Sequence, residues 1–428
     1  MAQANAEQPS DRTETTARMG FKELTALTAA VMALSALGID IMLPALGIIS
    51  RDLGVVHEND RQLIVIVYVL INGLAQFFVG PLVDWYGRRR MLLIAAGSYA
   101  VAAFLSIFAP SFLILLAARG GQGACVAIAR VAITATVRDQ YAGRRMAELS
   151  SLAFTVLMAA PIVAPALGQL TLAQGTWRDI FLILAAYGLV VGDWAFFRMP
   201  ETLAREARTP LSFASVFHSY GLFFRNRTAL GYTFVGACPF GGLVAFISSA
   251  EQIFLETFAI GDLFALAFAT MVVGLGVATL ANARLVGRLG MRPLAHSALV
   301  LLLAVNLVHL LTINFVGETI WLFIGFMTVS FFALGVLAPN CGAIALEPMG
   351  KIAGAAAALN GALGTTLSAL IGAMAARAYD GTTTPLVTAL AILGGASLAI
   401  ARFVETDGLF RARPASSDAV GGNQPSEH

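Results

Sequence analysis

The stretch Gly80-Pro81-Leu82-Val83-Asp84-Trp85-Tyr86-Gly87-Arg88-Arg89-Arg90 places one carboxylate, two glycines and three arginines between two long apolar segments. Residues 63–79 before it and residues 91–109 after it are almost wholly apolar. Segments of this length can cross a bilayer, so the charged stretch lies where two membrane-spanning helices meet water. We expect a tight, charged turn at one face of a membrane.

The composition of the whole chain indicates a polytopic membrane protein. Of its 428 residues, 58% are hydrophobic and 12% are charged, and the mean hydropathy is +0.79. A soluble surface needs a charged share of about 25–35%. The net charge of +2 gives no indication of a nucleic-acid partner. The cysteines Cys125, Cys238 and Cys341 lie in apolar segments without paired spacing, which predicts packing residues and neither disulfides nor a metal site.

Apolar segments of spanning length predict an all-α protein of twelve transmembrane helices. The polar ends, residues 1–20 and 406–428, are expected to be disordered. A polar linker at 201–227 divides the chain into an N-terminal bundle, 21–200, and a C-terminal bundle, 228–405. The linker residues 211–224 carry aromatic side chains at helical spacing, which predicts an interfacial helix or an extension of the seventh helix. The expected spans are residues 22–50, 61–82, 90–109, 111–137, 148–173, 178–199, 228–253, 262–284, 294–314, 319–346, 351–378 and 383–404.

The distribution of basic residues predicts the orientation. The loops after the second, fourth, sixth, eighth and tenth helices hold fifteen Arg and Lys residues, whereas the loops of the opposite side hold four, Arg51, Arg61, Arg178 and Arg377. Loops rich in Arg and Lys remain in the cytoplasm. We therefore expect a multi-pass membrane protein with both termini and the Gly80 to Arg90 stretch in the cytoplasm.

The second half of the chain repeats the charged turn. The segment Asn282-Ala283-Arg284-Leu285-Val286-Gly287-Arg288-Leu289-Gly290-Met291-Arg292 follows the eighth helix as Gly80 to Arg90 follows the second. Two duplicated six-helix halves would produce such a repeat. In the second copy Asn282 replaces the early glycine and no carboxylate corresponds to Asp84, so only the first turn has an acidic member.

The order of motifs along residues 22–405 resembles the major facilitator superfamily. The stretch Gly80 to Arg90 resembles the loop between its second and third helices, and Arg119-Gly120-Gly121-Gln122-Gly123 resembles an arginine motif of its fourth helix. Residues 130–139, 338–346 and 354–359 are similar to segments of the bicyclomycin-resistance (Bcr/CflA) type of drug:proton antiporters, which have twelve spanning helices.

The fifth helix carries a further motif of the same family. Its segment Ala160-Pro161-Ile162-Val163-Ala164-Pro165-Ala166-Leu167-Gly168 resembles a sequence typical of antiporters, although Ala164 stands where the family has glycine. The motif residues carried over are Pro161, Pro165 and Gly168. The resemblance implies two pseudo-symmetric six-helix bundles around a central cavity, a proton gradient as the energy source without a cofactor, and a monomer.

The resemblance also implies that the charged stretch is a cytoplasmic gate. Its residues are Gly80, Asp84, Gly87, Arg88, Arg89 and Asp139. We expect Arg88 to pair with Asp139 at the inner end of the fourth helix, and Asp84 to face the start of the eleventh helix near Gly354, where a helix N-terminus favours an anion. Such a latch would hold the two bundles together while the cavity faces outward.

Ionisable residues inside the membrane are functional candidates because a charge there is costly unless it is paired, hydrated or neutralised. Asp40, deep in the first helix, is the candidate proton carrier. Arg119 lies about 12 Å deep in the fourth helix at about 1.5 Å per residue, at a level through which the first helix also passes. Contact between the two, direct or through water, would couple a proton to a conformational change. The alternatives are a structural aspartate near Pro44 and a structural arginine.

Four other ionisable residues stand in or near the apolar segments. For Arg130 and Asp193, close to the cytoplasmic ends of the fourth and sixth helices, we favour a structural role. His309 is interpreted as a packed, neutral histidine. Glu251 stands at the outer end of the seventh helix where the related exporters have proline, which favours a hydrated helix end over a second protonatable acid.

The candidates for the substrate cavity are polar and aromatic residues of the second, fourth, seventh and tenth helices: Tyr68, Asn72, Gln122, Tyr232, Phe240 and Asn340. Ordinary packing between helices is the alternative for each of them. We expect a proton-coupled exporter of small hydrophobic or amphipathic compounds such as antibiotics, working by alternating access. The alternative is a dedicated metabolite exporter or a proton-coupled importer of the same fold. The chain lacks the sequence signatures of zinc proteases, serine hydrolases and P-loop enzymes, so we do not expect an enzyme.

Overall fold

The computed structural model describes residues 19–204, 206, 208, 213–406 and 408–411, and every regular element in this part of the chain is helical. The expected disordered ends, residues 1–20 and 406–428, lie almost wholly outside the described residues. In chain order the elements are α1 (Phe21–Asp40), η1 (Leu43–Ala45), α2 (Leu46–Asp52), η2 (Glu58–Gln62), α3 (Leu63–Tyr86), α4 (Arg88–Ile107), α5 (Phe112–Gln140), α6 (Gly143–Gln174), α7 (Trp177–Arg198), α8 (Phe213–Arg225), α9 (Arg227–Gln252), η4 (Ile253–Thr257), η5 (Gly261–Leu263), α10 (Phe264–Leu289), α11 (Met291–Phe315), α12 (Ile320–Leu346), η6 (Glu347–Ile352), α13 (Ala353–Arg377) and α14 (Thr384–Val404).

Eleven helical segments of the described part are long and apolar enough to cross a bilayer. The remaining expected span, residues 148–173, lies within α6, a helix of 32 residues. The first expected span is not one continuous helix, because a short break at η1 separates α1 from α2. The predicted all-α membrane fold is therefore confirmed, with the first span broken.

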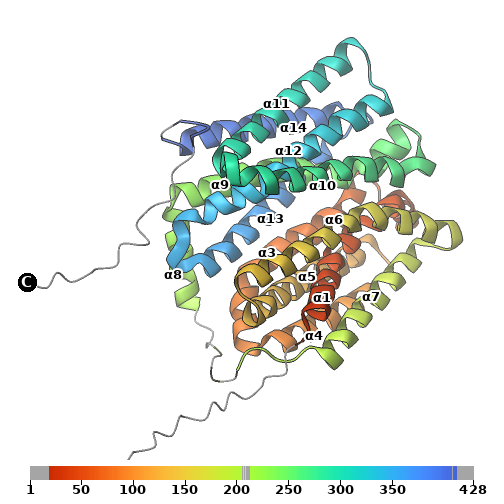
Figure 1. Ribbon diagram of the computed structural model, residues 1–428. Helices are drawn as coiled ribbons and strands as arrows, with labels where there is room; N and C mark the ends of the chain where they lie inside the picture. The colour runs from red at the N-terminus through yellow and green to blue at the C-terminus, as the bar shows by residue number, and fades with distance from the viewer. Residues whose placement is uncertain (1–18, 205, 207, 209–212, 407, 412–428) are drawn as a thin grey trace, which may run out of the picture.

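The helices form two neighbouring groups, α1 to α7 and α9 to α14 (Figure 1). Across the groups α3 packs along α13, and α6 packs along α10. Small residues permit the close approach, since a Cβ at Gly73 of α3 would lie 2.6 Å from the Thr366 amide nitrogen of α13. These two helix contacts join the two halves of the molecule.

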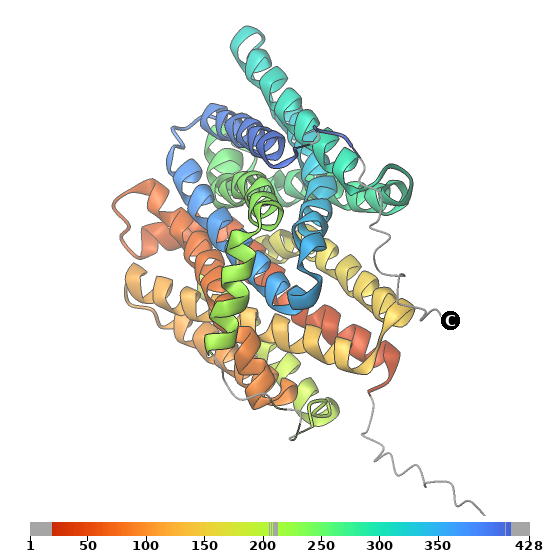
Figure 2. The same ribbon diagram turned by 90° about the vertical axis from the view of Figure 1, so that its left-hand side faces the viewer.

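The helix α8 connects the two groups at one face of the molecule (Figure 2). The Tyr220 hydroxyl donates a hydrogen bond of 2.8 Å to the Phe77 carbonyl of α3, and α8 also contacts α9 and α13. Asn226 separates α8 from α9, and its side chain caps α9 by accepting a hydrogen bond from the Ala229 amide. The expected interfacial helix is therefore a separate element, and the alternative of an extended seventh helix is wrong.

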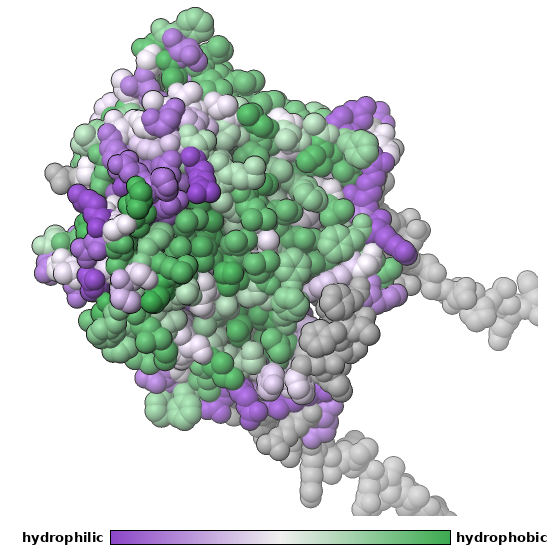
Figure 3. Space-filling view, turned by 180° about the vertical axis from the view of Figure 1, so that it is seen from behind, coloured by the Kyte–Doolittle hydropathy of each residue, from purple (hydrophilic) through white to green (hydrophobic). Residues whose placement is uncertain are grey.

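The surface seen in Figure 3 is predominantly hydrophobic between hydrophilic ends. Large apolar side chains point outward from the helices, among them Phe104, Leu113 and Ile392, which are 49%, 75% and 65% exposed. An apolar surface of this extent is typical of contact with lipid. Following the arginine count, we call the face with α8 the inner face and the opposite one the outer face.

The tight turn expected in the charged stretch Gly80 to Arg90 is present, but it is shorter than the stretch itself. The helix α3 continues to Tyr86 and α4 begins at Arg88, so the turn is Gly87 alone, with φ +100° and ψ 153°. The repeat in the second half has the same geometry, since Gly290 alone, with φ 84° and ψ 161°, separates α10 from α11. Positive φ values favour glycine, which explains why both copies retain it.

Candidate functional site

The break in the first span lies directly after Asp40. Pro44 lacks an amide hydrogen and cannot bond to the carbonyl of residue 40, so the α-helix ends there and a 3-10 turn follows. The Asp40 residue is 4% exposed. No other described residue forms a hydrogen bond or an ion pair with its carboxyl group. A buried carboxyl group without a cation beside it is costly to ionise, which makes it a functional candidate.

Arg119 of α5 is fully buried next to this break. Its guanidinium donates to the Gly38 carbonyl at 2.6 Å, to the Ile64 carbonyl at 3.3 Å and to the Gln122 side chain at 2.5 Å. It also lies 4.4 Å from the centre of the Tyr68 ring. Arg119 therefore joins α1, α3 and α5 through polar groups that carry no net charge.

Contact between Asp40 and Arg119 was expected either directly or through water, and the direct form is not present in this structure. The guanidinium bonds to the backbone of Gly38, two residues before Asp40. Gly38 also leaves room for the Tyr68 ring that lies beneath the guanidinium, because a Cβ there would lie 2.6 Å from the Tyr68 hydroxyl oxygen. Arg119 of α5 thus contacts α1 two residues before Asp40 without pairing with its carboxyl group.

The Pro161 to Gly168 segment of α6 packs against the same break. Pro161 and Pro165 lie inside α6, and a Cβ at Gly168 would overlap the Ile41 carbonyl oxygen and contact Pro44 at 3.0 Å. Gly168 therefore allows α6 to lie directly on the backbone that follows Asp40. The three segments that the sequence singled out in the first, fourth and fifth helices meet around this point.

A cavity of about 230 Å³ lies between the two groups of helices, and it is lined from α1, α3, α5, α9 and α13. Tyr68, Asn72 and Phe240 line it as predicted. A second compartment of about 150 Å³ shares Phe240 with it and is lined by Tyr232. We call the two compartments together the central cavity.

Two predicted cavity residues lie elsewhere. Gln122 is fully buried in the contact with Arg119. Asn340 is 1% exposed and donates to Asn282 of α10 at 2.6 Å and to the Val336 carbonyl at 2.7 Å. Both side chains bond across or along helices, which is the packing alternative that the sequence left open.

At the inner face the gate residues form an ion-pair cluster within the first half. Arg88 is 5% exposed, and its Nε lies 2.9 Å from Asp139, so the expected pairing is present. Its Nη2 lies 3.1 Å from Asp84, and its amide donates to Glu201 at 2.9 Å. Arg89 donates to the Phe196 carbonyl. Glu201 of the sixth-helix end is the partner that the sequence interpretation had not assigned.

Asp84 does not contact the start of α13 in this structure. A cavity of about 270 Å³ lies between them and is lined by Gly80, Asp84, Arg138 and Gly354. Asp84 is paired with Arg88 instead, and its side chain is 46% exposed. The two halves are therefore separated at this point of the inner face.

The second half has an equivalent cluster that the sequence reasoning missed. Arg292 is 4% exposed, and it lies 2.7 Å from Glu405 at the end of α14 and 2.7 Å from Glu347 after α12. Glu405 also accepts a hydrogen bond of 2.8 Å from Tyr232, whose hydroxyl lies 2.8 Å from His296. The repeat lacks an acid in the turn itself, and acids from the ends of two other helices take that place. The match between Pro200-Glu201-Thr202 and Val404-Glu405-Thr406 was the available signal.

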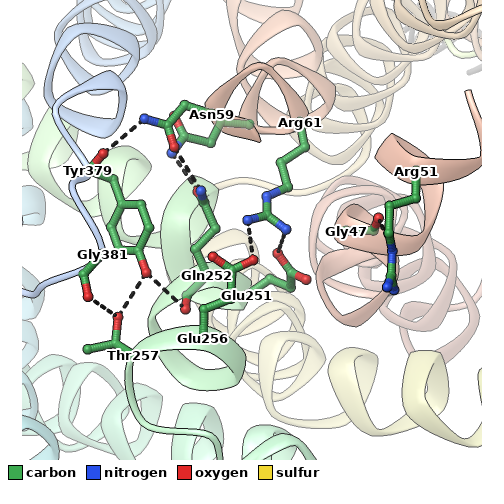
Figure 4. Close-up of polar contacts among 11 residues, drawn as sticks. Gly47, Arg51, Asn59, Arg61, Glu251, Gln252, Glu256, Thr257, Tyr379 and Gly381 are labelled. Atoms are coloured by element: carbon green, nitrogen blue, oxygen red, sulfur yellow. Dashed lines mark hydrogen bonds and ion pairs between the residues drawn. The ribbon is translucent and has the colours of Figure 1, made fainter. Parts of the chain in front are cut away.

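At the outer face a buried ion pair joins the two halves (Figure 4). Arg61 of η2 lies 3.1 Å from Glu251 of α9, and their side chains are 7% and 6% exposed. Arg61 also pairs with Glu256 of η4, whose side chain is 43% exposed. Gly47 of α2 leaves space for the pair, because a Cβ there would lie 2.5 Å from Glu251 Oε1 and 2.8 Å from Arg61 Nη1. Glu251 is therefore not a hydrated helix end, as the sequence suggested, but half of an ion pair between the bundles.

Neutral hydrogen bonds surround this ion pair. Gln62 donates to Gln252 at 2.7 Å and to the Ala376 carbonyl at 3.0 Å. Gln252 donates to Asn59 at 2.8 Å, and Asn59 donates to the Tyr379 carbonyl at 3.0 Å. We call this set, with Arg61, Glu251 and Glu256, the outer interlock. It closes the outer face by contacts between the two halves.

The remaining ionisable candidates have distinct surroundings. His309 is fully buried, stacks on Phe326 with the ring centres 4.4 Å apart, and lies 2.5 Å from Glu318. It is packed, as expected, yet it has an acidic partner. Asp193 is exposed on α7. Within the described part of the chain, no group of His, Cys, Asp and Glu is arranged to hold a metal ion.

Comparison with known proteins gives consistent matches. Residues 28–373 match the family profile described as Major Facilitator Superfamily. A bicyclomycin resistance protein homolog of Haemophilus influenzae is 28% identical over 358 residues, covering 82% of this chain and 88% of that protein. Multidrug resistance protein D of Escherichia coli is 26% identical over 366 residues, covering 82% and 89%. The solved structure of the human organic anion transporter MFSD10 shares the fold, with a TM-score of 0.64 and 18% identity over 91% of this chain and 100% of that one.

Proposed function

The chain belongs to the Major Facilitator Superfamily, and on this premise we propose that it is a proton-coupled exporter of small hydrophobic or amphipathic compounds across a bacterial inner membrane. Relatives named for resistance to bicyclomycin, to chloramphenicol and to multiple drugs support drug efflux as the activity. In this proposal the chain acts as a monomer with both termini in the cytoplasm, and it moves its substrate without chemical change.

The contrast between the two faces supports alternating access. The outer interlock joins the halves through the Arg61 to Glu251 pair. At the inner face a cavity separates Asp84 from Gly354. Opening of one face with closure of the other exposes a central site to each side in turn. In this scheme the structure is the state closed to the outside, and contact between Asp84 and the N-terminus of α13 belongs to the state closed to the cytoplasm.

The buried carboxyl group of Asp40 is the observation that carries proton coupling. In the proposal it takes up a proton when the cavity faces outward and releases it when the cavity faces inward. Arg119 is the residue that responds, because it bonds to Gly38 two residues away and an ionised Asp40 would attract its guanidinium. Gly168 of α6 transmits the change, since α6 lies on the backbone next to Asp40.

A susceptibility panel tests export directly. A strain that expresses the chain is compared with a strain carrying the empty vector, across antibiotics of different size and charge, with and without an uncoupler at a concentration below its own toxicity. Export driven by protons predicts reduced susceptibility to some of the antibiotics and loss of that protection with the uncoupler. Protection that survives the uncoupler contradicts proton coupling, and unchanged susceptibility to the whole panel contradicts drug export.

A further inference from the structure

The central cavity contains one charged side chain that the coupling scheme does not use. Arg130 of α5 lines the cavity and is exposed to it. Among the described residues that line the two compartments, Arg130 is the only charged one. No ion pair or side-chain hydrogen bond joins its guanidinium to another residue of the described part. A structural arginine or one that reaches the inner surface, as the sequence favoured, would have a partner or a surface position.

The acidic residues Asp40 and Asp84 do not pair with Arg130. Asp40 follows the lining residue Ile39, yet it is 4% exposed and does not line the cavity. Asp84, in the inner cavity, is paired with Arg88 at 3.1 Å. A guanidinium inside a membrane protein without a counter-charge is costly. A negatively charged ligand would supply that counter-charge, and the planar guanidinium suits a carboxylate.

The rest of the cavity wall favours a ligand with an apolar body. Tyr68 and Phe240 provide aromatic surface. The side-chain oxygen of Asn72 accepts a hydrogen bond from Gln76. Its amide nitrogen donates no hydrogen bond to another described residue, so it is free to donate to a ligand. The lining of the central cavity thus offers a ligand one cation, one neutral hydrogen-bond donor and a mostly apolar surface.

The same helix carries a second arginine toward the inner face. Arg138 is exposed and lines the inner cavity between the halves. Eight residues separate it from Arg130, or about 12 Å along an α-helix. Two positive charges that follow one another from the inner cavity to the central cavity attract anions and raise their local concentration.

Building on the proposed export function, we propose that the substrates are amphipathic organic anions, and that Arg130 binds their carboxylate in the central cavity. Arg130 is thus a specificity-determining residue that distinguishes an anion from its neutral analogue. The proton carrier Asp40 and the anion site are separate groups in this arrangement.

The test compares matched ligands on the purified full chain in detergent, without a proton gradient. A series of aromatic carboxylates from benzoate to pyrenebutyrate is paired with the corresponding primary amides, and each affinity is measured by ligand-induced thermal stabilisation in about 0.15 M salt. For at least one pair the carboxylate is expected to bind about 10-fold to 100-fold tighter than its amide, as a hydrogen bond to a charged group implies. Arg130→Gln should abolish the difference and Arg130→Lys should retain part of it.

The matched control is Arg402→Gln, which removes the same charge from an exposed position of α14 that lines neither the central nor the inner cavity, and it should leave the ratio of affinities unchanged. The proposal is overturned if no carboxylate in the series binds more tightly than its amide, or if the ratio survives Arg130→Gln. If Arg130→Gln fails to fold, the carboxylate-to-amide affinity ratios of the wild type and of Arg130→Lys still test the proposal. Because binding is measured without a gradient, a negative result leaves proton-coupled export of neutral drugs standing, whereas failure of the susceptibility panel would remove export itself.

Discussion

The outer interlock predicts that one substitution shifts the protein from the closed to the open outer face. Arg61→Gln leaves Glu251 buried, at 6% side-chain exposure, without the guanidinium that lies 3.1 Å away. Removing one partner of a buried ion pair costs about 3–5 kcal/mol. Glu256 adds little, because its side chain is 43% exposed and exposed pairs contribute about 0–1 kcal/mol.

The whole penalty falls on the closed state. When the outer face opens, water reaches Glu251 and compensates for the lost arginine. A penalty of about 3 kcal/mol corresponds to a shift of about 100-fold in the equilibrium between the two states, at 1.4 kcal/mol per tenfold. Arg61→Gln should therefore populate an outward-open state that is scarce in the wild type.

Distances between spin labels can measure this shift. Val56 of the first half and Val316 of the second are 87% and 76% exposed near the outer face, so cysteines there accept labels. Cys125, Cys238 and Cys341 are buried and would be replaced by alanine or serine. Electron–electron double resonance should show a longer distance in Arg61→Gln than in the wild type.

Two controls separate the buried pair from a general loss of charge. Arg377→Gln removes an arginine from the same face, but its pair with Asp60 at 3.3 Å has the arginine side chain 71% exposed, so the distances should stay as in the wild type. Adding Glu251→Gln to Arg61→Gln removes the unpaired charge and should restore the short distance. An unchanged distance distribution in Arg61→Gln would refute the interlock as the element that holds the outer face closed.

Three further predictions concern the other clusters. Gly168→Ala should abolish transport, because its Cβ would overlap the Ile41 carbonyl oxygen, whereas Gly97→Ala, with no atom within 4 Å of the added Cβ, should transport normally in the same assay. Asp84→Asn should slow turnover with little change in substrate affinity, measured as initial rates and binding; a large loss of affinity at normal turnover would contradict the latch. Arg292→Gln should lower the melting temperature of the purified protein, since Glu405, 4% exposed, loses a guanidinium at 2.7 Å, while Arg198→Gln, from a pair with the arginine side chain 63% exposed, should not.

The fold was predictable because a bilayer imposes one length on each span. Continuous apolar runs marked the spanning helices, and the repeated glycines at Gly87 and Gly290 marked the same turn in both halves. The extent of the charged turn was misjudged because charged residues that follow a span can continue its helix. The break at Pro44 was visible as a proline, but only the structure places Asp40 at the end of α1.

The candidate site was predictable where a single residue could be recognised by its own chemistry. It was not predictable where residues from two distant segments form a contact. Asp40 and Arg119 stood out as ionisable residues in apolar helices. The partner of Arg61 lies 190 residues away at Glu251, and nothing in the local sequence of either residue indicates the other. Gln122 and Asn340 were assigned to the cavity because polar residues in membrane helices suit a cavity or a neighbouring helix equally well, and the direction of each side chain decides between them.

In the proposed mechanism Asp40 carries the proton that drives export. The most direct test reconstitutes the full chain in liposomes with an imposed pH gradient, and records substrate movement together with proton movement by a pH-sensitive dye. Asp40→Asn is compared with Asp193→Asn, which removes an exposed carboxylate from another spanning helix. We predict that Asp40→Asn abolishes proton-driven transport while substrate still binds, and that Asp193→Asn behaves as the wild type. Full gradient-driven transport by Asp40→Asn would contradict the role of Asp40 as the proton carrier.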